Sequence, residues 1–358
     1  MKKKLVGMLA TATLLTMALA GNVQAAEIRS VGPDGEAAVD ASTIELTDDQ
    51  IAQIKEGGYT AAICLHYGGN DWSTSQQKGL EDTFGELGIE IVAVTDANFS
   101  AETQVSNIEK VMAKKPDILV SIPTDATATA DAYKQAAAAG IKIVFMDQRA
   151  DGLEAGKDYV SVVSADNYGN GYASGTVLGD ALGGKGKVAM VYYDANFAPT
   201  NQRDEGFRDA MKNYPDIEIV TEQGFTDESG CAEQGDAILT QFPNIDGIYA
   251  SWDVPMEGVL SAVRAAGMEG KVTLACNDLG NNVAREIASG NIAGGGAQMP
   301  YDQGVAEAKL AALALLGEET PSYVAVPAET VTHENVLEAY TDVYHVETPD
   351  WLKEAYVE

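Results

Sequence analysis

Residues 181–208, ALGGKGKVAMVYYDANFAPTNQRDEGFR, predict the fold of the whole chain. A glycine-rich turn leads into the apolar run 187–193, which predicts a strand. A loop follows, and then a predicted helix that opens with Asn201, Gln202 and Arg203. Strand, loop and helix in this order form the unit of an open α/β sheet, in which ligands bind at the carboxyl ends of the strands. Arg203 falls in the first turn of that helix, so its guanidinium can lean over the strand ends.

The same alternation of apolar runs and helical segments occurs twice along the chain. A first series of strands is predicted at residues 60–65, 90–94, 117–122, 141–146 and 159–164. A second series is predicted at residues 187–193, 218–221, 247–251, 272–276 and 292–297. Near-continuous apolar strands separated by helices indicate a parallel sheet covered on both faces. The predicted fold class is therefore α/β, with two doubly wound parallel-sheet lobes. A remaining helix at 302–316 and a strand at 323–326 could complete the first lobe.

Composition and charge limit the classes of partner. The chain has 358 residues, enough for two domains of ordinary size, and its formal net charge is −31. Nucleic acid is excluded as a partner because phosphate binding needs a basic face. The excess of carboxylates is typical of a soluble protein, and we expect a monomer.

The first 25 residues have the pattern of a secretory signal peptide. A lysine-rich start precedes an apolar run from 5 to 20, and small residues surround the predicted cleavage site at Val23-Gln24-Ala25. We therefore expect an exported protein, periplasmic or, if the source lacks an outer membrane, extracellular.

Two segments flank the predicted lobes. Residues 26–58 are predicted to be a linker and a short helix that packs outside the main fold. The helix should begin at the capping box formed by Thr47 and Gln50. Residues 346–358 are predicted to be a C-terminal tail that folds back on the surface.

The sequence lacks a recognisable catalytic or cofactor motif. Gly179-x4-Gly184-Lys185 resembles a phosphate-binding loop, but Gly186 stands where Ser or Thr is required, and the motif precedes a strand instead of following one. No Gly-x-Ser-x-Gly nucleophile elbow is present. The histidines have no metal-ligand spacing: His66, His333 and His345. We expect no cofactor, no metal and no enzymatic activity.

Polar and aromatic residues follow the predicted strands at their carboxyl ends. Examples are Asn70 and Trp72 after the first strand, and Asp147, Gln148 and Arg149 after the fourth. The second series adds Tyr193, Trp252, Asp278 and Gln298. Each Asp or Asn could instead cap the following helix. Together, carboxylates, amides and arginines suit vicinal hydroxyl groups, and tryptophan suits the C–H face of a sugar.

Residues 59–331 resemble type I periplasmic binding proteins of the ribose-binding, carbohydrate ABC-transporter class. The segments that carry the resemblance are PTDA (123–126), VFMDQR (144–149), SADNYGNG (164–171), NQRDEGF (201–207), SWDVPMEGVL (251–260), CNDLG (276–280) and AQMPYDQG (297–304). The resemblance implies a ligand cleft between the lobes and a hinge of three inter-lobe strands, near residues 164–166, 298–299 and 327–329. It further implies lobes of 59–164 plus 299–328 and of 165–298 plus 329–345.

The resemblance also implies which residues contact the ligand. By position, the sugar contacts of the family fall on Asn70, Trp72, Asp147, Gln148, Arg203, Trp252, Asp278 and Gln298. Arg149 joins them because the family has Asp-Arg-Gln where this chain has Asp147-Gln148-Arg149. Further departures are Trp252 before Asp253, where ribose binders have asparagine, and Ser73 in place of a second aromatic residue. The departures keep the carbohydrate class but do not specify ribose.

The function that the resemblance implies is capture of a small sugar or polyol and its delivery to an ABC permease in the membrane. One alternative is a sensor that presents a sugar or furanosyl signal to a chemoreceptor or sensor kinase. A second alternative is a secreted carbohydrate-acting enzyme, which would need Asp147 and Asp278 as its acid and base.

Overall fold

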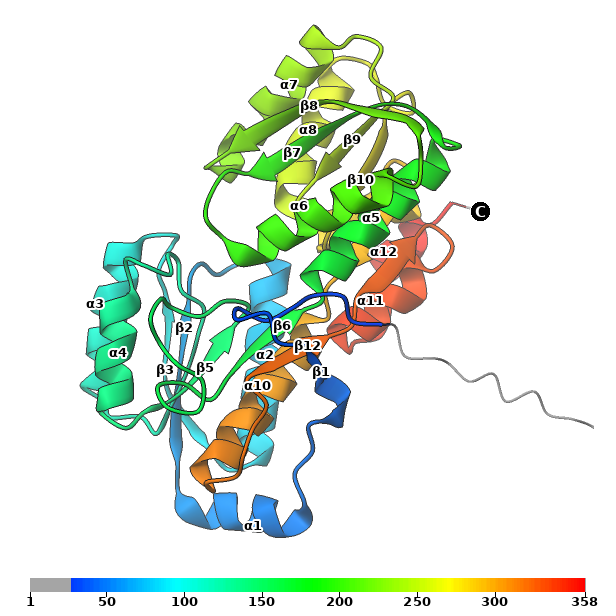
Figure 1. Cartoon of the computed structure of the whole chain (residues 1–358). Coiled ribbons are helices and arrows are strands. Elements are labelled where there is room, and N and C mark those ends of the chain that lie inside the picture. The colour runs from blue at the N-terminus through cyan, green and yellow to red at the C-terminus, as the bar shows by residue number, and fades with distance from the viewer. Residues whose placement is uncertain (1–26, 358) are drawn as a thin grey trace, which may run out of the picture.

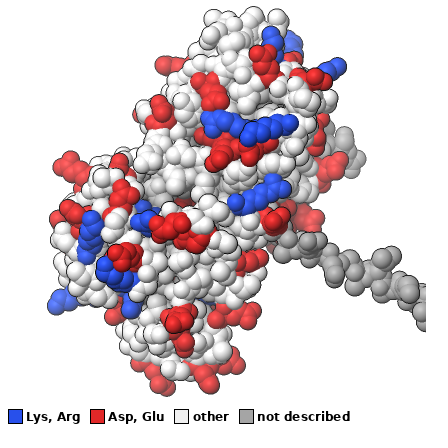
Figure 2. Space-filling model, in the orientation of Figure 1, with Lys and Arg blue, Asp and Glu red and all other residues white. Residues whose placement is uncertain are grey.

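Two α/β lobes stand one above the other in the computed structural model, which describes residues 27–357 (Figure 1). The predicted signal peptide, 1–25, lies outside the described residues. Within the described part of the chain, no helix has both the length and the apolar character needed to cross a membrane. Figure 2 shows carboxylates distributed over both lobes on the displayed face, many of them beside a lysine or arginine.

The first lobe contains a parallel sheet of seven strands in the order β1-β12-β6-β5-β4-β2-β3. The strands are β1 (Val39–Asp40), β2 (Thr60–Leu65), β3 (Glu90–Asp96), β4 (Ile118–Ser121), β5 (Lys142–Met146), β6 (Ser161–Ala165) and β12 (Tyr323–Val326). Alternate residues of β2 pack into different cores, Ile63 on one face and Cys64 on the other. Both faces of the strand are buried, which explains its continuous apolar run.

Five helices cover this sheet. They are α1 (Asp48–Gly57), α2 (Asp71–Glu86), α3 (Ala101–Met112), α4 (Ala130–Ala138) and α10 (Pro300–Leu315). Helices α3 and α4 lie on one face, and α2 and α10 lie on the other (Figure 1). Thus the late elements α10 and β12 belong to the first lobe.

The second lobe contains six strands in the order β13-β11-β10-β9-β7-β8. These are β7 (Lys185–Tyr193), β8 (Asp216–Phe225), β9 (Gly247–Ala250), β10 (Thr273–Cys276), β11 (Gly294–Ala297) and the antiparallel edge strand β13 (Glu329–Thr332). Its helices are α5 (Asn167–Ala181), α6 (Ala198–Met211), α7 (Cys231–Gln241), α8 (Asp253–Ala265), α9 (Asn281–Ala288), α11 (Val336–Tyr344) and α12 (Asp350–Ala355). The predicted fold class, two doubly wound α/β lobes, is confirmed.

The chain passes between the two lobes three times. It does so at Asp166 between β6 and α5, at residues 298–299 between β11 and α10, and at residues 327–328 between β12 and β13. These three segments join the two lobes, at the positions where the resemblance implies a hinge.

The N-terminal segment differs from the predicted linker that packs outside the main fold. Residues 39–40 form β1, an edge strand of the first sheet, and Ile54 of α1 is fully buried in the core of that lobe. The backbone N–H groups of Arg29 and Ser30 donate to the carboxylate of Asp166, at 2.9 and 2.8 Å. Backbone hydrogen bonds of this kind order a polar, aperiodic segment that side-chain periodicity cannot reveal. The capping box of Thr47 and Gln50 is present as predicted.

The C-terminal tail is also ordered. Its helix α12 packs against α9, with Leu352 fully buried, and the guanidinium of Arg285 lies 5.1 Å from the centre of the Trp351 ring. The tail therefore extends the core of the second lobe.

Candidate ligand-binding site

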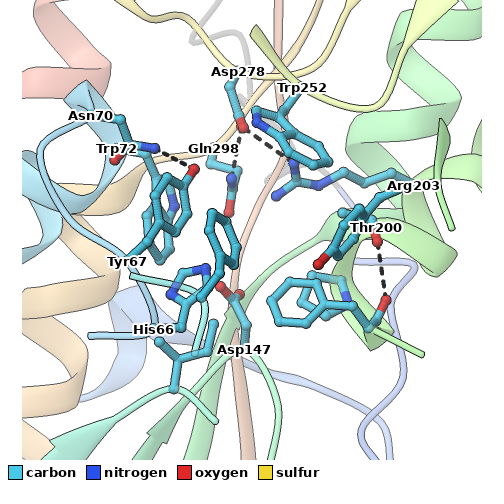
Figure 3. A pocket seen from close by; sticks show the side chains of 15 residues that line it. His66, Tyr67, Asn70, Trp72, Asp147, Thr200, Arg203, Trp252, Asp278 and Gln298 are labelled. Atoms are coloured by element: carbon cyan, nitrogen blue, oxygen red, sulfur yellow. Dashed lines mark hydrogen bonds and ion pairs between the residues drawn. The ribbon is translucent and has the colours of Figure 1, made fainter. Parts of the chain in front are cut away.

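A cavity lies between the two lobes, and Gln298 at one of the crossings is part of its lining (Figure 3). The first lobe contributes residues from the loops after β2, β3, β4 and β5 and from the start of α2. The second lobe contributes residues from α6 and from the ends of β7, β9, β10 and β11. The lining residues are His66, Tyr67, Asn70, Trp72, Phe99, Ile122, Asp147, Tyr193, Phe197, Pro199, Thr200, Arg203, Trp252, Asp278 and Gln298. The carboxyl ends of two parallel sheets thus face a common space, as the sequence predicts.

The two aspartates of the cavity have a left-handed backbone conformation. Asp147 follows β5 with φ 53°, and Asp278 follows β10 with φ 69°. The left-handed region is unfavourable for most L-residues but is tolerated by aspartate, and such conformations cluster at binding sites. Each carboxylate therefore turns away from the direction of its strand and toward the space between the lobes.

Arg203 is the central cation of the cavity and only 5% exposed. Its Nε donates to Oδ1 of Asn167 at 2.8 Å, and its Nη1 donates to the carbonyl of Ser251 at 3.2 Å. Nη1 also forms an ion pair with Oδ2 of Asp278 at 3.1 Å. Three directed contacts hold the planar guanidinium in one orientation at the cavity wall.

Hydrogen bonds hold both carboxylates, from Gln298 at a crossing and from Ser164 of β6 and Gln303 of α10. Oδ1 of Asp278 accepts from Nε2 of Gln298 at 2.7 Å. Oδ1 of Asp147 accepts from Oγ of Ser164 at 2.9 Å and from Nε2 of Gln303 at 3.3 Å. Asp147 is therefore held within the first lobe, whereas Asp278 is held by a residue at a crossing between the lobes.

Burial and neighbouring charges shift the pKa values of these groups. Burial raises the pKa of Asp147 above its ordinary value, although Arg203 and the hydroxyl of Ser164 act in the opposite direction. Burial opposes the charge of Arg203, yet Asp278 and Asp147 together raise its pKa above the usual value. Arg203 is therefore permanently charged and provides a fixed donor for any acceptor in the cavity.

Aromatic rings form an arc around the remaining wall. His66 of the first lobe stacks on Phe197 of the second, with centroids 5.7 Å apart. Tyr193 lies edge-on to Trp252 at 5.6 Å, and His66 lies edge-on to Trp72 at 5.8 Å. The indole N–H of Trp252 donates to Oε1 of Glu228 at 2.8 Å, which fixes the ring. Rings from both lobes can thus contact the apolar face of one ligand.

Three polar atoms of lining residues are buried without a hydrogen-bond partner among the described residues: His66 Nδ1, Trp72 Nε1 and Gln298 Oε1. Burial lowers the pKa of His66 to about 3, so the imidazole is neutral at physiological pH. Buried polar atoms normally form hydrogen bonds. A polar ligand could accept from the indole N–H of Trp72, donate to Oε1 of Gln298, and donate to or accept from Nδ1 of His66, depending on the tautomer.

Phe99 reaches the cavity from a strained loop. Asn98 and Phe99 have φ values of 47° and 58°, a conformation that is costly for a bulky residue. The turn is held by two bonds, in which Asn98 N donates to Oδ1 of Asp96 and Phe99 N donates to the carbonyl of His66. As a result, the Phe99 ring stacks on Tyr67, with centroids 4.1 Å apart.

Seven of the nine predicted ligand contacts line the cavity, namely Asn70, Trp72, Asp147, Arg203, Trp252, Asp278 and Gln298. A residue can both line the cavity and cap a helix. Asn70 does so, because its Oδ1 accepts from the backbone N of Ser73 at 2.8 Å and caps α2.

Gln148 and Arg149 lie outside the cavity. Gln148 spans the cleft beside it, donating from Nε2 to the carbonyl of Pro123 and accepting from Ala198 N on Oε1. Arg149 points to the N-terminal segment and pairs with Asp34 at 2.7 Å. Successive residues after a strand point in different directions, so sharing the end of β5 with Asp147 does not bring them into the cavity.

The sequence interpretation did not assign most of the aromatic arc or the α6 contacts Pro199 and Thr200. The strand-end rule already names Tyr193, and His66 and Tyr67 follow the first predicted strand in the same way. Phe197 lies inside the stretch 181–208, just before α6. Phe99 carries no comparable signal, because its place depends on the left-handed turn.

Asp204, the neighbour of Arg203, leads to a testable prediction about stability. It is buried beneath the cavity, and its Oδ1 accepts from Oγ of Ser251 at 2.7 Å and from the hydroxyl of Tyr249 at 3.3 Å. Burial raises its pKa from 3.8 to about 6. The folded state thus binds a proton more tightly than the unfolded state, and stability decreases as pH rises from about 4 to 6.

We expect Asp204→Asn to remove this pH dependence, because the neutral amide carbonyl can accept both hydrogen bonds. At pH 7.5 the variant should be more stable than wild type by up to about 3 kcal/mol, and the difference should vanish near pH 4. Urea unfolding at a series of pH values measures this, with the exposed Asp131→Asn as control. An equal effect at pH 4 and pH 7.5 would contradict the prediction.

The geometry defines a class of protein: a two-lobed binding protein with an inter-lobe cavity that combines a fixed arginine, two carboxylates and an aromatic wall. Comparison with known proteins agrees. Residues 61–319 match the family model described as a periplasmic binding protein domain. The chain therefore belongs to the periplasmic binding protein family, and within it resembles the type I, ribose-binding branch.

Relatives and solved structures support this branch. The D-ribose/D-allose-binding protein of Pseudomonas aeruginosa is 29% identical, over 73% of this chain and 83% of its own length. A solute-binding protein from Actinobacillus succinogenes, solved with bound D-allose, is 29% identical with a TM-score of 0.72, covering 78% of this chain and 99% of that one. A solute-binding protein from Agrobacterium vitis, solved with α-D-tagatopyranose, is 26% identical with a TM-score of 0.74, covering 80% and 98%.

Proposed function

We propose that this protein is exported, binds one small sugar or polyol in the inter-lobe cavity, and delivers it to an ABC permease. The observation that carries the proposal is the chain of contacts from Arg203 through Asp278 to Gln298. It places a fixed donor beside fixed acceptors, which matches the vicinal hydroxyl groups of a carbohydrate. The named ligands of the relatives, ribose, allose and tagatose, support the same class.

The proposed ligand contacts are the seven lining residues predicted from the sequence, with the aromatic arc as additional contacts. One sugar hydroxyl can accept a hydrogen bond from Arg203 while it donates one to Asp278. In a dry cavity, each of these two hydrogen bonds strengthens the other. The tryptophans would cover the C–H faces of the ring. The protein is proposed to act as a monomer, with a chemoreceptor or sensor kinase as an alternative receiver of the closed form.

A thermal-shift screen against pentoses, hexoses, deoxy-sugars and polyols tests the proposal. At 100-fold over its dissociation constant, a true ligand should stabilise the protein by about 2.7 kcal/mol. Ligand should also shrink the radius of gyration in solution scattering, since binding favours lobe closure. The sugar recovered after release should be chemically unchanged. No stabilisation by any member of the screen would contradict the proposal, and a converted sugar would indicate an enzyme.

Trp72 and Trp252 allow the aromatic contacts to be tested one lobe at a time. Trp72→Ala and Trp252→Ala should each weaken sugar binding by roughly 1–3 kcal/mol, the range for losing an aromatic anchor. Tryptophan fluorescence should respond to ligand in the wild type but not in the double variant. Trp351, packed against Arg285 away from the cavity, is the control. A ligand response that survives in the double variant would refute the assignment.

A further inference from the structure

Helix α9 begins in the second lobe without a cap of its own. Its N-cap residue is Gly280, which has no side chain and an extended backbone with φ −56° and ψ 156°. The first N–H groups of a helix have no partner within the helix and need an external acceptor. A carboxylate is especially favourable there because of the helix dipole.

The acceptor comes from the other lobe. Asp71, the first residue of α2, accepts from the backbone N of Asn281 on Oδ2 at 2.7 Å. Its other oxygen, Oδ1, accepts from the side-chain Nδ2 of Asn281 at 2.8 Å. Both oxygens of one carboxylate are therefore used across the cleft, in the manner of an N-cap supplied by a separate body.

The second lobe holds its side of this contact in place. Oδ1 of Asn281 accepts from the hydroxyl of Tyr340 in α11, which directs the amide NH₂ toward Asp71. The carbonyl of Leu279 accepts from the hydroxyl of Tyr344 at 2.8 Å, which fixes the loop before α9. The receiving groups are thus oriented by their own lobe, so docking of Asp71 orders few additional side chains.

Both residues of this contact are close in sequence to residues that line the cavity. Asp71 stands between Asn70 and Trp72, which both line the cavity, whereas Asp71 itself does not. Asn281 follows the lining residue Asp278 by three positions. The approach that brings Asn70 and Trp72 to a ligand held by Asp278 also brings the Asp71 carboxylate to α9.

We infer that Asp71 is a closure residue: it acts on ligand affinity by capping α9 across the cleft and holding the lobes closed, without contacting the ligand. The effect on affinity rests on the proposed function. Loss of a helix cap of this kind should reduce the population of the closed form about tenfold. The apparent affinity scales with the fraction of protein that is able to bind. The apparent dissociation constant should therefore rise by the same factor by which the closed form becomes rarer.

The test uses two variants on opposite sides of the contact and D-allose and D-tagatose as probes. Asp71→Ala removes the acceptor. Asn281→Pro removes both donors yet keeps the helix, because proline fits the first position of a helix. Each variant should raise the dissociation constant about five- to twentyfold, mainly through faster dissociation. The double variant should be no worse than either single one, because both remove the same contact.

Glu81→Ala, on the exposed face of the same helix α2, is the matched control and should bind like the wild type. Wild-type affinity and dissociation rate in Asp71→Ala would overturn the inference, as would additive effects in the double variant.

If the wild type binds neither sugar nor any other member of the screen, the proposed function fails, and a ligand-free experiment decides the inference separately. The pair Asp71→Cys and Asn281→Cys should then form a cross-link under mild oxidation, since closure brings the two positions together. The three native cysteines are buried and serve as background. Absence of the cross-link would overturn the inference.

Discussion

Arg203→Ala is expected to weaken sugar binding by at least about a hundredfold. The side chain offers three directed contacts in the cavity, and its removal leaves Asp278 largely buried without its ion-pair partner. Breaking one side of a buried pair typically costs about 3–5 kcal/mol, far more than an ordinary hydrogen bond of ~1 kcal/mol. The dissociation constant should therefore rise by at least about a hundredfold. Calorimetry with the sugar found in the screen measures the loss.

Arg203→Lys should recover little of this affinity. An ammonium is a point charge and cannot donate to Asn167, Ser251 and Asp278 in the fixed directions of the guanidinium fork. Arg208→Ala is the matched control, because Arg208 lies on the same helix but pairs with Glu222 in a half-exposed position. Near wild-type binding in Arg203→Ala, with the fold intact by circular dichroism, would refute the assignment of Arg203 as a ligand contact.

The strength of the sequence prediction lies in the apolar strands. Residues 60–65 and 323–326 match β2 and β12 at both ends, because a strand buried on both faces requires a continuous apolar run. Strand β8 is longer than the predicted 218–221, since Asp216–Phe225 is half-exposed and carries charged residues among the apolar ones. A strand therefore has a continuous apolar run where both of its faces are buried, and it lacks one where it is partly exposed.

The limits of the prediction lie in single-residue backbone geometry. Asp147 reaches the cavity because its φ is positive, whereas Gln148 and Arg149 continue in other directions. The residue types alone do not show which of the three faces the ligand. The N-terminal segment is a similar case, because Arg29 and Ser30 are ordered through their backbone N–H groups. Neither feature leaves a periodic trace in the sequence.

Gly171→Ala is expected to have the largest effect on the fold and to disable the cavity as well. Gly171 lies in α5 where that helix meets α6, and a Cβ added there would stand 1.8 Å from the carbonyl oxygen of Arg203. The obstacle is backbone and cannot rotate away. The reciprocal position, Gly206 of α6, would place a Cβ 2.1 Å from the carbonyl oxygen of Tyr168. Helices α5 and α6 are therefore in backbone contact on both sides.

The substitution must push α6 away from α5, which loses the packing around Phe207 and moves Arg203 off its partners. Overpacking a tight site costs typically 1–3 kcal/mol, and a clash with backbone should reach or exceed about 3 kcal/mol. Binding should fall together with stability, because the guanidinium is carried by the displaced turn. Urea unfolding and calorimetry on the same samples measure both quantities.

Gly85→Ala is the matched control with the opposite expected sign. Gly85 lies in helix α2, is exposed, and an added Cβ would meet nothing within 4 Å. Alanine should therefore stabilise that helix by roughly 0.5–1 kcal/mol, through its higher helix propensity. If Gly171→Ala instead had wild-type stability and affinity, α5 and α6 could not be in the close contact described, and Arg203 would not depend on that contact for its position.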